Sequence, residues 1–186
     1  RILSVILGSS TYSFSIMLAA FISGITLGSL FIFLYANRWK NYYAIFAWTE
    51  LAISFMVILG LMGYNHLPYY FLRFSNILTR TEETFLIYQT VQFFLCFMVM
   101  LIPTFFFGMT IPLATRIAIH GMQTVGSGVG SVYAVNTVGT IFGSVGTAII
   151  LIPTLGIDNS IIFAACLNFF IATLLFCTNS SANTLR

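Results

Sequence analysis

The amino-acid sequence predicts an all-α integral membrane protein, with one bundle of transmembrane helices over residues 1–178. Two observations predict this class. Only 6% of the 186 residues are charged, whereas 59% are hydrophobic, and a soluble domain carries about 25% charged residues. The hydrophobic residues also gather in runs long enough to cross a bilayer core, which takes about 20 helical residues. The lipid bilayer is therefore the expected surroundings of this chain.

Five apolar runs reach this length, and each is expected to form one span. A sixth span is expected before Arg1 in the full protein. The third run contains Pro103 and Pro112, and each proline removes a backbone donor and is expected to kink the helix. The five expected spans cover residues 9–36, 42–63, 86–115, 128–154 and 159–178.

The connections between the runs predict the orientation. The turn at 37–41 is short and basic, 64–85 is a longer extramembrane or interfacial connection, and 179–186 is a polar tail or linker. The side reached after the first, third and fifth runs carries more basic residues close to helix ends, and such residues favour the cytoplasm. We expect a bacterial inner membrane, with the 37–41 turn and the C-terminus cytoplasmic. The basic residues on that side are Arg38, Lys40, Arg116 and Arg186.

Glu50 is the one acidic residue inside an expected span. An intramembrane carboxyl either serves a proton or cation site or stays protonated as a structural hydrogen-bonding group, and both interpretations remain open. Glu50 and Asn136 each lie eight residues into runs that start on the same side, at a depth of about 12 Å. We therefore expect an inward polar cluster that could bind a small cationic ligand. Its members are Glu50, Thr110, Tyr133, Asn136 and Thr137.

Glycines four residues apart form a second pattern. This spacing places small residues on one helix face and lets two helix backbones approach closely. The expected role is packing within the bundle, and the alternative is homodimerisation through an exposed glycine face. The glycines concerned are Gly24, Gly28, Gly126, Gly130, Gly139, Gly143 and Gly146.

Several functions have no support in the sequence. No nucleophile elbow, phosphate loop or dinucleotide fingerprint is present, and the sequence has no metal-ligand spacing and no basic cluster for nucleic acid. We expect no cofactor, no bound metal and no catalytic residue in this segment, and whether the whole protein is an enzyme stays open.

Several segments in order resemble the membrane region of spermidine synthase-like proteins. They are RILSVILGSSTY (1–12), MLAAF (17–21), GITLGS (24–29), LIPTFFFGMTIPLATR (101–116), YAVNTVG (133–139) and LIPTLG (151–156), together with the acid at Glu50. In that family a multi-helix membrane region precedes an aminopropyltransferase-like domain. No strand, glycine loop and helix follow Cys177, so this segment lacks the catalytic domain. Asn37 also stands where the family's turn has an aspartate.

The resemblance implies a membrane domain that is similar to half of a transporter and anchors a cytoplasmic domain. Such a domain could also transport or present a small cationic substrate such as a polyamine. The alternative is a non-catalytic accessory subunit of a larger membrane complex, whose apolar and glycine faces contact other transmembrane helices.

Overall fold

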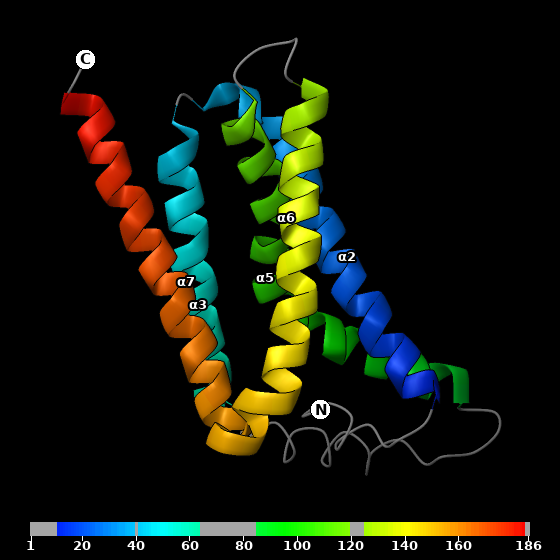
Figure 1. Cartoon of the computed structure of the whole chain (residues 1–186). Helices are drawn as coiled ribbons and strands as arrows, with labels where there is room; N and C mark the ends of the chain where they lie inside the picture. Colours follow the sequence, from blue (N-terminus) through cyan, green and yellow to red (C-terminus); the bar gives the residue numbers. More distant parts are fainter. Residues whose placement is uncertain (1–10, 40, 64–84, 120–124, 185–186) are drawn as a thin grey trace.

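The computed structural model describes residues 11–39, 41–63, 85–119 and 125–184 (Figure 1). Within these ranges the chain is helical and contains no β-strand, so the prediction of an all-α fold is confirmed for them. The elements are α2 (Thr11–Tyr35), the 3-10 turn η1 (Ala36–Arg38), α3 (Tyr42–Gly63), α5 (Phe85–Ala118), α6 (Val125–Gly146), the π-helix η5 (Thr147–Leu151) and α7 (Ile152–Thr184).

In the described residues, four stretches rather than five are long and apolar enough to cross a membrane. The count of five is wrong because the fourth and fifth expected spans belong to one uninterrupted stretch of 54 residues. That stretch nevertheless doubles back, and Figure 1 shows α6 and α7 leading upward from a common turn. The four stretches are Met17–Arg38, Tyr42–Met62, Met100–Ala118 and Val125–Thr178.

The reversal between α6 and α7 depends on Gly156. Its backbone has φ 79° and ψ 175°, a conformation that glycine adopts readily and other residues avoid. The Ser160 hydroxyl donates a hydrogen bond to the Gly156 carbonyl oxygen at 2.5 Å. This bond connects the reversal at Gly156 to the helical turn of α7 that follows it. The helical hairpin therefore has a local cause in the sequence.

The corner between α2 and α3 is also built locally. The Trp39 N–H donates to the Ala36 carbonyl at 3.1 Å and Trp39 itself is extended, which ends the first helix. The Asn41 side-chain oxygen then accepts the Ala44 N–H at 3.2 Å, the usual role of an N-cap asparagine. The Tyr42 hydroxyl donates back to Ala36 at 3.2 Å, so α3 returns beside α2.

Three expected features concern the kinks in the third span, the connection at 64–85 and the tail at 179–186. Helix α5 continues through both Pro103 and Pro112, and Figure 1 shows its first turns running across the foot of the bundle before the rest stands upright. Helix α7 continues to Thr184, so the expected polar tail at 179–186 is helical over its described part. The connection expected at 64–85 lies outside the described residues, apart from Phe85.

Helix α2 packs along α5, and two of the predicted glycines make this possible. A Cβ atom at Gly24 would collide with the Thr104 side chain, and one at Gly28 would lie 1.9 Å from the Phe105 carbonyl oxygen. Gly108 of α5 meets the Ile25 backbone in the same way. The Ser29 hydroxyl also donates to the Gly108 carbonyl at 2.8 Å, so the two backbones are in direct contact.

Helix α6 has six glycines, and five of them do not pack in this way. Gly128, near the start of the helix, meets Ala118 and Ile119, but no described heavy atom of a neighbouring element lies within 4 Å of the position that a Cβ would take at the other five. The expectation that these five pack within the bundle is therefore corrected for the described part of the chain. Helix α6 contacts α5 sparingly, so the five have no described neighbour to meet. The glycines concerned are Gly126, Gly130, Gly139, Gly143 and Gly146.

Helix α3 lies between α5 and α7 and contacts both. A buried cluster of Ile32, Ala36, Met109 and Leu113 joins the upper part of α2 to α5, and Tyr42, Ile45 and Phe46 of α3 pack against it. On the other side of α3, the buried Ser54 hydroxyl donates to the Ala165 carbonyl of α7 at 2.9 Å. These contacts fix α3, and with it Glu50, at the centre of the described bundle.

Candidate functional site

Glu50 lies on the wall of a pocket formed by four helices, called here the Glu50 pocket. Its volume is about 560 Å³, within the range of roughly 300–1,000 Å³ found for small-molecule sites. Helix α3 contributes two residues, α5 three, α6 four and α7 one. The lining residues are Phe46, Glu50, Thr110, Ile111, Ala114, Ser131, Val132, Val135, Asn136 and Ile171.

The Glu50 side chain is buried, with 7% of the residue exposed. It makes no hydrogen bond or ion pair with any residue that the structure describes. No buried side-chain oxygen or nitrogen in the described residues is both sealed off and unpartnered, so the carboxyl keeps its access to the pocket. The Glu50 carboxyl can therefore bind a ligand that enters the pocket.

Two further polar groups face the same pocket. The Asn136 side chain is exposed and makes no side-chain hydrogen bond within the described residues. The Thr110 hydroxyl donates to the Phe107 carbonyl at 2.8 Å, which leaves its oxygen lone pairs able to accept. The pocket therefore offers carboxyl, amide and hydroxyl oxygens in a lining that is otherwise mostly apolar.

Helix geometry explains which residues of α6 reach the pocket. With about 3.6 residues per turn, Ser131, Val132, Val135 and Asn136 share one face, and Asn136 lies at its edge. Tyr133 and Thr137 fall beyond that edge.

Two members of the expected cluster therefore do not join it. Tyr133 is 55% exposed, and the Thr137 hydroxyl donates to the Tyr133 carbonyl within α6 at 2.8 Å. Neither residue lines the pocket. The expected cluster is thus reduced to Glu50, Thr110 and Asn136.

Sequence reasoning missed two lining residues, and spacing could have indicated one of them. Phe46 lies four residues before Glu50, which places it one turn earlier on the same face of α3. Ser131 lies five residues before Asn136, and its hydroxyl donates to the Gly128 carbonyl at 2.9 Å. Extending Glu50 by one helical turn would have suggested Phe46, whereas Ser131 lies one turn before Val135, which is not polar, so only the structure reveals it.

The chain matches no protein-family model, no curated protein and no solved structure. The resemblance to spermidine synthase-like proteins therefore depends on the quoted segments alone.

Proposed function

We propose that this chain is a membrane domain that binds a small cationic ligand in the Glu50 pocket. Binding would serve to transport the ligand or to present it to a partner domain. The observation that carries the proposal is the Glu50 carboxyl, which is buried, has no partner among the described residues and opens onto a pocket of ligand size.

The chemistry of the lining favours a cation. None of the lining residues is basic, so no protein charge competes for the carboxyl. Asn136 and Thr110 add neutral acceptors that suit the N–H groups of an ammonium ligand. The Phe46 ring adds a face that attracts a cation by its quadrupole. A carboxyl beside neutral acceptors and an aromatic ring is a combination typical of amine recognition.

The resemblance to spermidine synthase-like proteins supports a polyamine as the ligand. It also supports a role as the anchor of an aminopropyltransferase-like domain. Transport fits the position of Glu50 between α5 and α7, because intramembrane acids commonly line ion and substrate pathways.

We also propose that the chain lies in an inner membrane, from the length of its apolar helices and the positions of its arginines. Four long apolar stretches suit a lipid environment. Arg38 and Arg116 lie near one end of the bundle, because Arg38 follows α2 and Arg116 is in the last turn of α5. This arrangement supports an inner membrane with that end in the cytoplasm.

The second candidate function is an accessory subunit of a larger membrane complex. It is favoured by five of the six glycines of α6, which have no neighbouring described atom against them although such faces suit close helix contact. Gel filtration of the solubilised native protein separates the two readings, because a stable assembly with other proteins supports the subunit.

The decisive experiment measures binding of spermidine to the purified protein by calorimetry. Glu50→Gln keeps the size of the side chain and removes its charge. A charge-assisted hydrogen bond contributes about 1.5–3 kcal/mol, so we expect the affinity to fall about 10- to 100-fold. Thr137→Ala is the control, since this hydroxyl is on α6 but does not line the pocket, and it should bind as the wild type does. Equal spermidine affinity in wild type and Glu50→Gln would refute the cation site.

A further inference from the structure

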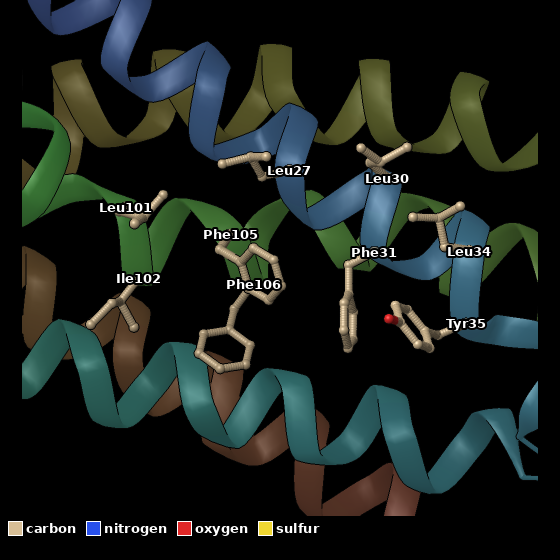
Figure 2. A pocket seen from close by; sticks show the side chains of 9 residues that line it. All are labelled: Leu27, Leu30, Phe31, Leu34, Tyr35, Leu101, Ile102, Phe105 and Phe106. Atoms are coloured by element: carbon tan, nitrogen blue, oxygen red, sulfur yellow. The ribbon is translucent and has the colours of Figure 1, made fainter.

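A second pocket lies between α2 and α5, beside the backbone contacts that the glycines of α2 make with α5, and is called here the α2–α5 pocket. Its volume is about 510 Å³. Figure 2 shows the nine lining side chains arranged along the two helices. They are Leu27, Leu30, Phe31, Leu34, Tyr35, Leu101, Ile102, Phe105 and Phe106.

The lining is hydrocarbon at every position but one. Eight of the nine side chains are leucine, isoleucine or phenylalanine, and the exception is the phenol oxygen of Tyr35, which Figure 2 places at one end of the row. From Leu27 to Tyr35 the pocket follows α2 for about 12 Å. An occupant must therefore be apolar over this length and can be polar only near Tyr35.

That end of the pocket is positively charged. The Arg38 guanidinium carbon lies 5.2 Å from the centre of the Tyr35 ring, and Arg38 is exposed. A second cation is near, because Arg116 donates to the side-chain oxygen of Asn37 at 3.0 Å. The described acids are elsewhere, since Glu50 lines its own pocket and Asp158 follows the turn at the other end of the bundle. An anionic head group would therefore find two arginines that have no described acid beside them.

The shape of the pocket distinguishes a lipid from a helix. Close helix contact needs small residues, whereas this pocket is lined by large side chains. Several of them reach outward, with Leu34 59% and Ile102 49% exposed. Tyr35 and Trp39 are residue types that gather at the level of lipid head groups, which places Arg38 at that level too. A flexible acyl chain can fit between such side chains, whereas close approach of a helix backbone is disfavoured here.

We infer that the α2–α5 pocket holds an acyl chain of an anionic glycerophospholipid, with the phosphate head group bound by Arg38. The aromatic side chains of Phe31, Tyr35 and Phe105 form one wall, with centroid distances of 5.0 Å for Phe31–Tyr35 and 5.5 Å for Phe31–Phe105. The bound lipid is a structural ligand of the α2–α5 pair and is independent of the Glu50 pocket.

The test compares phosphatidylglycerol with phosphatidylcholine of the same acyl chains by native mass spectrometry of the purified protein. One arginine near the membrane surface favours an anionic lipid by about 1 kcal/mol, so we expect about fivefold tighter binding of phosphatidylglycerol. Arg38→Gln should abolish this preference, and Arg38→Lys should keep it.

The apolar part of the site is tested separately. Leu34→Trp fills the pocket and should weaken both lipids at least fivefold, and Ile102→Phe from the opposite wall should act in the same direction. Leu174→Trp is the matched control, because this residue is half-exposed on α7 and away from the pocket. Equal affinity for the two lipids in the wild type would overturn the inference. Unchanged binding in both filling variants would overturn it too. Efficient disulfide formation between two copies of Leu34→Cys would instead assign the pocket to a second copy of the chain.

Discussion

Replacing Gly28 by alanine should break the closest helix contact in the described bundle. The added Cβ would lie 1.9 Å from the Phe105 carbonyl oxygen, 2.9 Å from its carbonyl carbon and 3.1 Å from the Gly108 Cα. Non-bonded carbon atoms prefer separations of about 3.5–4.0 Å. The nearest atoms belong to the backbone of α5, so no side-chain rotation relieves the clash, and the two helices must separate by on the order of 1 Å.

The expected loss of stability is about 2 kcal/mol. Forcing a methyl group into a packed interface typically costs about 1–3 kcal/mol. Separation also breaks the hydrogen bond from Ser29 to the Gly108 carbonyl, and interhelical bonds of this kind contribute about 0.6 kcal/mol in membrane proteins. Alanine gains up to about 1 kcal/mol in helix propensity over glycine, which offsets part of the loss.

The assay is equilibrium unfolding of the purified protein in mixed micelles, followed by tryptophan fluorescence. Trp39 reports on this region because its ring lies 5.8 Å from that of Phe31, which packs against the α2–α5 core. Gly143→Ala on α6 is the matched control, since no described atom of a neighbouring element lies within 4 Å of its Cβ position. This variant should be as stable as the wild type or up to about 1 kcal/mol more stable.

Two results would refute this reasoning. An unchanged unfolding midpoint for Gly28→Ala would mean that α2 and α5 do not meet through this glycine. A loss in Gly143→Ala as large as that in Gly28→Ala would mean that a neighbour covers the α6 face in the folded protein.

Three further predictions follow from single residues. Gly156→Ala should lower stability by about 1–3 kcal/mol because its positive φ of 79° strains any other residue, whereas Gly146→Ala should not, as thermal melting of both variants will show. Ser54→Ala should cost about 1 kcal/mol by removing a buried bond of 2.9 Å to the backbone of α7, while Ser23→Ala, whose hydroxyl bonds within its own exposed helix face, should unfold with the wild type. Glu50→Leu should raise stability by about 1–3 kcal/mol while abolishing spermidine binding, because it removes a buried polar group that lacks a described partner; a less stable variant would indicate that the carboxyl has a structural role instead.

The depth of each polar residue along its helix could be predicted from the sequence. The direction in which each helix face points could not. Glu50 and Asn136 were expected at one level because each lies eight residues from a helix start at the same end, and helical rise is constant. The structure places both on one pocket. The direction in which α6 faces depends on which helices lie beside it, and a single helix sequence does not contain that information. Tyr133 and Thr137 were therefore assigned to the cluster although they lie beyond its edge.

The predicted number of membrane spans was wrong for a related reason. Hydrophobicity marks where a helix can lie in lipid, but the residues at the α6–α7 turn are themselves apolar. The break expected between the fourth and fifth spans, at 155–158, contains Gly156, whose backbone conformation reverses the chain. Helical structure nevertheless runs through this break as one stretch of 54 residues, and composition does not show that continuity.

The two sets of glycines show most clearly what spacing alone can establish. Gly24 and Gly28 are four residues apart, as are Gly139 and Gly143, and the pattern predicts a smooth face for each pair. Only the first pair meets a neighbour in the described chain, because α5 presents Gly108 at the matching level. A smooth face is thus necessary for close packing but needs a complementary face. No described helix offers such a face to α6, so a partner for its glycines would have to come from another molecule. Disulfide cross-linking of Gly143→Cys between two copies of the chain would identify a second copy as that partner. A monomer whose α6 glycines face lipid would remove the main support for a subunit role.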